Sequence, residues 1–386
     1  MHAEVRLKRG RDKKLRGFYP WVQRGEILFV NDDPKPGDIV RVTDSNGQFV
    51  AIASFNGKSR FPLRIFSLIE RPIDLGFFAE RIELAKENRA RWISETNAMR
   101  VVFSEADGLP GLIIDQYADV LVVQSRTAAI DRLKPLWLEA LASVFNPRGI
   151  YERSDMAGRE EEGLQPFFGP IWGEPGETVD FQESGFEFNA PFAQGLKTGF
   201  YLDQRETRRK FETEVKPGES VADLFCYTGA MSLYAARAGA TVVGVDILPE
   251  AIELANQHAD RNNLKAEFIV GNAFEWLEAS SEKYDWIILD PPAIAKSRTG
   301  KSSLKWAIWK LIYNALPRLK PNGKIVACSC SYQLSAEGVI ESARLAASDR
   351  GRRLFLRDIT IQAPDHPHLV QFPESLYLKC LWFEAD

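Results

Sequence analysis

The segment from Ser220 to Ala230 constrains the fold of this chain more than any other, once it is combined with the acid at Asp246. It reads SVADLFCYTGA, in which a short apolar strand carries Asp223 near its end and a turn closes at Gly229. A helix with small and apolar residues follows, and then a second strand, TVVGV, that runs into Asp246. Strand, glycine turn, helix, strand and terminal acid predict half of a nucleotide-binding α/β sheet.

The turn also limits which nucleotide can bind. A dinucleotide with a pyrophosphate usually meets three glycines, whereas Cys226, Tyr227 and Thr228 precede a single Gly229 here, and no Walker lysine is present. A ligand with a ribose and a cationic tail but no phosphate fits better, and S-adenosylmethionine is such a ligand. The alternative is an ordinary strand–turn–helix that binds nothing.

Length and charge predict a chain of two or three domains, one of which meets nucleic acid. The 386 residues hold 49 Lys and Arg against 53 Asp and Glu, but residues 1–66 alone hold 13 against 7. A basic module on an acidic body favours a phosphate-rich partner, although a solvated basic edge is the alternative. We expect no membrane span, no secretory signal and no disulfide framework for the four cysteines, and therefore a cytoplasmic protein.

Residues 1–70 predict an RNA-binding β-barrel. Short strands such as EILFV and QFVAIASF are separated by turns that include Asn46-Gly47 and Asn56-Gly57. The basic segment before them ends in Phe18-Tyr19-Pro20-Trp21, and basic residues beside aromatic ones suit RNA. The candidate RNA-binding residues are Lys13, Lys14, Arg16 and Trp21. For Trp21, a place over the barrel core is an equally good interpretation.

The rest of the chain predicts two α/β domains. Residues 71–180 predict a small central domain that starts with a helix over 71–100, whose apolar face includes Phe78, Ile82, Ala85 and Ala90. Residues 181–386 predict a hairpin over 181–206 and then a doubly wound, mostly parallel sheet. Its strands are expected at 220–225, 241–245, 266–270, 285–289 and 324–329, and the last two runs of the chain should pair antiparallel.

Two further strand ends offer groups for chemistry. DWIILD ends in Asp290-Pro291-Pro292, a stiff turn that would hold Asp290 against a substrate, unless it only ends the strand. The strand KIVACSCSY carries Cys328 and Cys330, and Cys330 lies at or beyond its end. We expect no metal, because no second Cys or His pair has suitable spacing. A buried structural cysteine is the serious alternative to a nucleophile.

A methyltransferase that acts on position 5 of a pyrimidine needs such a nucleophile. A thiolate that adds to position 6 makes the ring enamine-like, so that position 5 can attack the methyl group of S-adenosylmethionine. A base then removes the proton at position 5 and the thiolate leaves. The thiol pKa, ordinarily about 8.5, should be lowered by its surroundings, and the target base must be unstacked.

At this point the chain resembles a known family, the S-adenosylmethionine-dependent RNA cytosine-C5 methyltransferases, through DLFCYTG, GVD, the Asp-Pro-Pro turn and the SCS strand end. More specifically, it is similar to the 23S rRNA large-subunit methyltransferase I family over nearly its whole length. The basic start with YPWV resembles that family's PUA domain, DGLPGLIIDQYADVLVVQ its central EEHEE-like domain, and TGFYLDQRETR and FPESLYLK its remaining signatures.

The resemblance implies a fold and roles for particular residues. The fold would be α/β, with a PUA-like β-barrel at 1–70, a central domain at 71–180 and a Rossmann-like methyltransferase domain at 181–386. Cys330 would be the nucleophile, and Asp290 would orient the cytosine and assist proton movement. The remaining residues implied to bind the cofactor are Asp223, Phe225, Tyr227, Thr228, Gly229, Asp246, Ile247, Asn272, Ala273, Tyr201, Asp203 and Gln204.

The chain departs from the family pattern at several places, including YPW where HPW is frequent. Asn272 stands where Asp is frequent, and AIAK follows Asp-Pro-Pro where an aromatic residue is common. No cysteine follows Asp290 directly, so a second cysteine that releases the product is not available there.

Two other functions keep the same fold. An Asp-Pro-Pro turn also resembles that of enzymes that methylate an exocyclic amino group, which need no thiolate. A non-catalytic RNA-binding assembly factor is the alternative from another class. The expected partner is large-subunit ribosomal RNA, and an exposed edge strand near the C-terminus would permit a homodimer.

Overall fold

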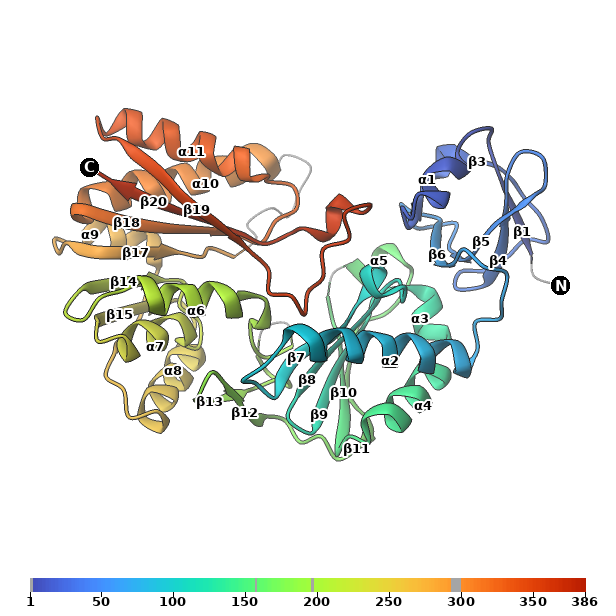
Figure 1. The fold of residues 1–386 in the computed structure, drawn as a ribbon, viewed down its shortest axis with the longest axis horizontal. Coiled ribbons are helices and arrows are strands. Elements are labelled where there is room, and N and C mark those ends of the chain that lie inside the picture. Colours follow the sequence, from blue (N-terminus) through green and yellow to red (C-terminus); the bar gives the residue numbers. More distant parts are fainter. Residues whose placement is uncertain (1–2, 157, 196–197, 293–299) are drawn as a thin grey trace. The chain divides into compact units, whose positions relative to one another are not determined.

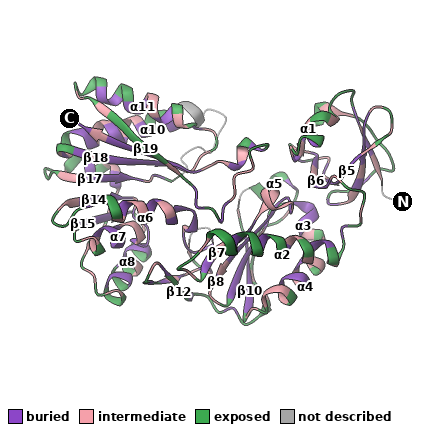
Figure 2. Ribbon diagram, in the orientation of Figure 1, coloured by how far each residue is buried: buried purple, intermediate pink, exposed green. Residues whose placement is uncertain are grey.

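A computed structural model describes residues 3–156, 158–195, 198–292 and 300–386 of the chain (Figure 1). They form two compact units, Met1–Leu202 with Pro364–Ser375, and Asp203–Ala363 with Leu376–Asp386. Buried residues follow the strands in both units (Figure 2). None of the helices in the described ranges combines the length and apolar character that a membrane span requires.

The N-terminal part of the first unit is a six-stranded sheet in the order β2-β6-β5-β4-β1-β3. The pairs are antiparallel except β1 with β4. The two edge strands, β2 and β3, do not pair with each other among the described residues, so the sheet is a half-barrel. This agrees with the predicted small β-domain. Its elements are β1 (Glu4–Leu7), α1 (Asp12–Arg16), β2 (Trp21–Val22), η1 (Arg24–Glu26), β3 (Ile27–Val30), β4 (Ile39–Thr43), β5 (Phe49–Phe55) and β6 (Leu63–Ser67).

A second sheet in the same unit has the order β11-β10-β9-β8-β7. Its pairs are antiparallel except β9 with β10, which the helices α3 and α4 connect. A two-stranded hairpin, β12 with β13, follows in this unit, earlier in the chain than the hairpin predicted at 181–206. The elements are α2 (Leu75–Trp92), β7 (Ala98–Phe103), η2 (Ser104–Asp107), β8 (Leu112–Tyr117), β9 (Val120–Ser125), α3 (Ala128–Arg132), α4 (Lys134–Phe145), β10 (Gly149–Ser154), α5 (Gly158–Glu161), β11 (Phe167–Gly173), β12 (Val179–Glu183) and β13 (Phe186–Ala190).

The buried face of α2 differs from the prediction at its C-terminal end. Ala90 is exposed, and the buried residue of that turn is Arg89. Its guanidinium forms two bonds to the carboxylate of Asp107, at 2.6 and 2.7 Å, and donates to the carbonyl oxygen of Asp365 at 3.0 Å. An arginine takes the core position because an ion pair satisfies it there, and apolar periodicity does not reveal such a pair.

The second unit is a seven-stranded sheet in the order β16-β15-β14-β17-β18-β20-β19. The pairs among β14 to β18 are parallel, and β20 is antiparallel to both of its neighbours, as predicted for the C-terminal runs. The elements are η3 (Leu202–Gln204), which begins in the first unit, α6 (Arg205–Glu214), β14 (Ser220–Leu224), α7 (Ala230–Arg237), β15 (Thr241–Asp246), α8 (Pro249–Arg261), β16 (Glu267–Val270), α9 (Ala273–Ala279), β17 (Tyr284–Leu289), α10 (Gly300–Ala315), η4 (Leu316–Arg318), β18 (Leu319–Ser329), α11 (Ala336–Asp349), β19 (Leu354–Ile361) and β20 (Lys379–Ala385). A further short helix, η5 (Pro373–Ser375), lies in the first unit.

Both faces of this sheet are buried, because alternate residues of the central strands enter two different cores. Ala222 and Leu224 pack with residues of α9, α10 and α11, whereas Val221 packs with residues of α6 and α7. Burial on both faces is what a doubly wound sheet requires. The chain leaves β14 on one side for β15 and later returns on the other side as β17, so the strand order reverses at β14. Ligands bind at such a switch point, outside the carboxyl ends of the strands.

In the first unit, the carboxylate of Glu162 joins the half-barrel to the central sheet. It is buried and accepts hydrogen bonds from Asn56 Nδ2 at 2.8 Å and Ser59 Oγ at 2.7 Å. Arg64 forms an ion pair with it at 3.4 Å. Asn56, Ser59 and Arg64 all belong to the half-barrel part of the chain, so these bonds act between the two sheets.

We predict that Glu162→Ala lowers the free energy of unfolding by about 2–4 kcal/mol, because it removes the buried carboxylate that accepts from Asn56 and Ser59 and one of the two carboxylates paired with Arg64. Glu161→Ala, which removes an exposed neighbour, is the matched control and should change it by less than about 0.5 kcal/mol. Urea unfolding followed by circular dichroism measures both. Equal stability of the two variants would contradict this role of Glu162.

Candidate active site

The turn after β14 is held in an unusual backbone conformation. Phe225, Tyr227 and Gly229 have positive φ angles of 66°, 49° and 76°. The N–H groups of Phe225 and Cys226 both donate to the carbonyl oxygen of Val245, at 2.8 and 3.1 Å. Two non-glycine residues with positive φ are held in place by the neighbouring strand, and such strain is often found at functional sites.

Gly229 is required for space as well as for conformation. It is the N-cap residue of α7, and a Cβ atom there would lie 2.8 Å from the ring of Phe268 and 3.0 Å from Ala255 Cβ. The turn therefore lies close against β16 and α8. This close packing directs the backbone of the turn and the N-terminus of α7 toward the carboxyl edge of the sheet.

Asp246 connects this turn to the loop after β15. One carboxylate oxygen accepts the N–H of Tyr227 at 2.9 Å and the other accepts the N–H of Leu248 at 3.0 Å. The side chain of Ile247, which precedes Leu248 in the chain, is 63% exposed. The structure thus places Asp246 and Ile247 at the end of β15, where the sequence predicts the ribose site.

The next predicted cofactor residue, Asp223, lies within β14 and is surrounded by protein. It is buried and accepts a hydrogen bond from Ser232 Oγ at 2.7 Å. Burial, together with the negative charges of Asp290 and Asp246, raises its pKa to about 7. A carboxyl group with a pKa near neutrality at a switch point is suited to a ligand that brings positive charge.

The other predicted cofactor residues surround this edge or cap nearby helices. The carbonyl oxygen of Thr228 accepts Nδ1–H of the buried His258 at 2.9 Å. Asn272 Oδ1 accepts the N–H of Phe274 at 3.0 Å and caps α9, which begins at the buried Ala273. The ring of Phe225 lies edge-on to that of Phe274.

The three residues predicted to close over the cofactor fall in different places. Gln204 Nε2 donates to Asp290 Oδ2 at 3.0 Å, which brings these two predicted residues together. Asp203 is buried, and its carboxylate accepts the hydroxyl of Tyr377 at 2.6 Å. Tyr201 belongs to the first unit, so its contribution stays a prediction.

The cysteines of the second unit differ in exposure. Cys328 and Cys380 are opposite each other on β18 and β20, and both are buried. A hydrogen bond between their thiols and their burial raise the pKa of Cys328 well above its ordinary value, so this thiol stays protonated. Cys226 is also buried, and its pKa is likewise raised by burial.

Cys330 is half-buried and follows β18 at the carboxyl edge. It lines a small pocket together with the prolines that follow Asp290. The other lining residues are Leu304, Ala307, Ile308, Cys328, Ser329 and Ser331. Asp290 and Cys330 thus follow directly after the neighbouring strands β17 and β18, and Cys330 and the two prolines after Asp290 line the pocket.

The predicted RNA-binding residues lie in the first unit and differ in how they are paired. Lys14 bonds to Glu26 at 2.6 Å and Arg16 to Asp12 at 3.0 Å. Lys13 is exposed and has no ion-pair partner within the described residues. Trp21 donates its indole N–H to Glu105 at 2.7 Å and stacks on Phe61, so much of its surface already faces protein.

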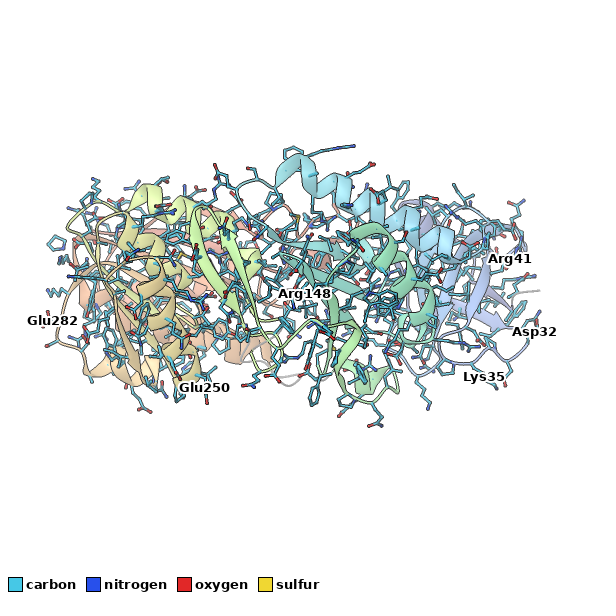
Figure 3. All side chains as sticks on the ribbon, turned by 90° about the horizontal axis from the view of Figure 1, so that it is seen from below. Asp32, Lys35, Arg41, Arg148, Glu250 and Glu282 are labelled. Carbon is cyan, nitrogen blue, oxygen red and sulfur yellow. The ribbon has the colours of Figure 1, made fainter. Side chains whose placement is uncertain are left out.

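Much of the remaining basic charge of this unit is also paired. Arg41 and Lys35, labelled in Figure 3, bond to Glu70 and Asp33. These ion pairs leave fewer of the basic side chains free to contact a phosphate, although pairs with acids inside residues 1–66 do not change the charge surplus of that segment. Within the described ranges, no group of three or more His, Cys, Asp or Glu residues could hold a metal ion.

Three residues near the site are not singled out by the sequence analysis. They are Ser232, His258 and Lys379, which bond to Asp223, Thr228 and the residue after Cys330, respectively. Ser232 and His258 lie on the buried faces of α7 and α8, and a polar residue within an apolar helix face is a signal that could have found them.

Comparisons with known proteins agree with this architecture. Residues 5–68 match the model of a PUA-like domain and residues 215–356 that of a methyltransferase domain. The crystal structure of SMU.776 complexed with SAH superposes with a TM-score of 0.86, at 22% identity and 99% coverage of both chains. A structure from Streptococcus mutans gives a TM-score of 0.85, at 22% identity, with 98% of this chain and 100% of that chain covered. These likenesses confirm the predicted fold.

Sequence relatives extend over the full chain. The ribosomal RNA large subunit methyltransferase I of Pseudoalteromonas translucida is 36% identical, with 99% of each chain covered. The protein of that name from Aeromonas hydrophila is 35% identical over the whole of both chains, and that from Vibrio cholerae is 34% identical over 98% of both. The chain therefore belongs to the ribosomal RNA large subunit methyltransferase I family.

Proposed function

We propose that this chain transfers the methyl group of S-adenosylmethionine to carbon 5 of a cytosine in 23S rRNA, through a covalent bond between Cys330 and carbon 6. The observation that supports this chemistry most strongly is the difference between the cysteines. Cys330 follows β18 at the carboxyl edge and is half-buried, whereas Cys328, which lines the same pocket, and Cys380 are fully buried opposite each other. Of these three cysteines, Cys330 is the one that is not fully buried, which supports it as the nucleophile.

The electron flow follows from ordinary nucleophilic chemistry. The Cys330 thiolate adds to carbon 6, and the electron pair of the 5,6 double bond becomes available at carbon 5. Carbon 5 attacks the sulfonium methyl group, and S-adenosylhomocysteine leaves with the electron pair of the broken bond. A base takes the proton from carbon 5, the double bond forms again and the carbon–sulfur bond breaks, which returns the thiolate.

Asp290 orients the cytosine ring and assists proton movement in this proposal. The amide of Gln204 holds one of its carboxylate oxygens at 3.0 Å. Pro291 and Pro292 stiffen the chain after it and line the pocket of Cys330. The carboxylate and the nucleophile are thereby held on rigid strand ends, which favours a productive geometry.

The cofactor occupies the switch point in this proposal. Asp223 and the backbone of Phe225, Tyr227, Thr228 and Gly229 bind the methionine part, and Asp246 accepts hydrogen bonds from the ribose. Ile247, Asn272 and Ala273 lie by the adenine. Tyr201, Asp203 and Gln204 close over the cofactor. The burial of Asp223 and the hydrogen-bonded carboxylate of Asp246 support these two roles.

We further propose that the chain has three domains, at residues 1–70, 71–180 and 181–386, and that the reaction takes place in the cytoplasm. A homodimer would use β19, an edge strand whose Phe355, Leu356, Ile359 and Ile361 are exposed.

Replacing the nucleophile should abolish the reaction. We predict that Cys330→Ala lowers methyl transfer to 23S rRNA by at least about 1000-fold, because carbon 5 is not activated without the thiolate. Cys328→Ala is the control and should stay within a few-fold of the unaltered chain. Titration calorimetry with S-adenosylhomocysteine shows whether both variants keep the folded cofactor site. Near-normal turnover by Cys330→Ala would instead favour methylation of an exocyclic amino group.

Cofactor binding should depend on pH through Asp223. Its raised pKa, about 7, means that the ligand-free site is protonated below neutrality, whereas a cationic ligand favours the ionised form. We predict that affinity for S-adenosylmethionine rises about tenfold between pH 6 and 8 and that binding at pH 6 releases a proton. Calorimetry in two buffers of different ionisation enthalpy measures both quantities.

Asp223→Asn is the matched variant for this test, and it should bind more weakly at pH 8 and no longer respond to pH. Equal affinity of the unaltered chain at pH 6 and pH 8 would contradict the role of Asp223. Absence of any binding heat would favour the non-catalytic assembly factor.

RNA binding should depend on the basic start of the chain. Replacing Lys13, Lys14 and Arg16 together by Gln should weaken binding of a 23S rRNA fragment and flatten its salt dependence, by about 0.7–0.9 in slope for each phosphate that the variant no longer neutralises. Lys13→Gln alone should account for much of the effect, since Lys13 has no ion-pair partner within the described residues. Lys35→Gln is the control, and filter binding at several salt concentrations gives the slopes. An unchanged slope in the triple variant rules out this docking site.

A further inference from the structure

A buried lysine lies at the strand end that carries Cys330. Lys379 is the first residue of β20, it is opposite Ser329 of β18, and it is only 5% exposed. Its ammonium group donates to the carbonyl oxygen of Ser331 at 2.6 Å. Lys379 therefore pairs with the residues on both sides of Cys330.

This ammonium group lacks the partner that a buried lysine usually has. Such a charge is normally paired with a carboxylate, because its burial is costly. Within the described part of the chain, no Asp or Glu forms an ion pair with Lys379, and the Ser331 carbonyl is its hydrogen-bond acceptor. Burial lowers the pKa of Lys379, and electrostatic interactions with Cys330 and, less strongly, Cys380 oppose this shift.

Of these two thiols, Cys330 is the better counter-ion. The Cys380 thiol already donates a hydrogen bond to Gln204 Oε1 at 3.4 Å, and it is opposite Cys328 rather than at the strand end. Cys330 lies between the two residues that pair with Lys379, and it lines the pocket.

We propose that Lys379 is a positioning residue whose ammonium group is the counter-ion of the Cys330 thiolate, so that the nucleophile is ionised before cytosine binds. This inference rests on the proposed function and deepens it. The thiol proton goes to solvent when the ion pair forms, and Lys379 keeps its own proton throughout. The same positive charge favours the last step, in which the carbon–sulfur bond breaks and the thiolate is formed again.

Other ionisable groups around this strand end make a cation necessary. Asp290 ends the neighbouring strand, and its negative charge raises the pKa of Cys328. The hydrogen bond to Cys380 and burial raise the pKa of Cys328 as well, so Cys328 supplies no charge there. A thiolate at position 330 without Lys379 would face a carboxylate and apolar surroundings, which both disfavour ionisation.

The test measures the ionisation of Cys330 directly, in the absence of RNA. Carbamidomethylation of the peptide that contains Cys330, followed by mass spectrometry from pH 5 to 10, gives the midpoint of its reactivity. We expect Lys379→Met to move this midpoint up by about one to two pH units, and to lower methyl transfer at pH 7 about tenfold or more. Lys379→Arg should restore most of both. Lys324→Met, in the middle of β18 where it is opposite Glu384, is the control and should change neither.

A reciprocal measurement uses unaltered Lys379, in case Lys379→Met does not fold. An NMR titration of ¹³C-labelled lysine should show that Cys330→Ala lowers the pKa of Lys379, since the two charges stabilise each other equally. An unchanged Cys330 midpoint in folded Lys379→Met, or an unchanged Lys379 titration in Cys330→Ala, overturns the ion pair. Neither readout requires methyl transfer. An active Cys330→Ala would therefore refute the proposed function while leaving the ion pair to be judged separately.

Discussion

The carboxylate of Asp246 is the group on which the arrangement of the cofactor edge depends. It accepts one backbone N–H from the turn after β14 and another from the loop after β15. Tyr227 can keep a positive φ because this bond and the bonds to the Val245 carbonyl hold the turn against its neighbour. A single acid therefore sets the relative position of two loops at the carboxyl edge of the sheet.

Cys328 and Cys330 are only two residues apart in the sequence, but they differ in burial because Cys328 lies within β18 and Cys330 lies beyond its end. Cys328 lies within β18, where β20 supplies Cys380 opposite it and both thiols are fully buried. Cys330 follows two residues later, beyond the last residue of the strand. The antiparallel strand β20 does more than cover the edge, because it also brings Lys379 to the place where β18 ends.

The first unit depends on buried charges that have partners. Arg89 holds Asp107 and the carbonyl oxygen of Asp365, and Glu162 gathers donors from the half-barrel. Both sets of bonds join segments that are far apart in sequence. Removing one partner from such a pair leaves the other buried and unpaired, which is why these bonds define a specific arrangement.

Strands, turns and several site residues could be predicted wherever their position depends only on nearby residues. The strands of the parallel sheet, the turn at Gly229 and the acids at Asp223, Asp246 and Asp290 all follow from apolar runs, turn residues and the ends of strands. The antiparallel pairing of the last two strands follows from their short connection. Resemblance added the prediction that Cys330 is the nucleophile, whereas the spacing of the cysteines left open whether it is reactive or structural.

The sequence did not reveal which polar groups are buried together, because this depends on how distant segments pack. Arg89 in place of Ala90 on α2, the pairing of Lys14 and Arg16, the hydrogen bond from Ser232 to Asp223 and the position of Lys379 all depend on partners that the sequence does not place. The reason is physical: apolar periodicity reports that a position is buried, whereas the ionisation of a buried group depends on the distance to charges contributed by other strands and helices.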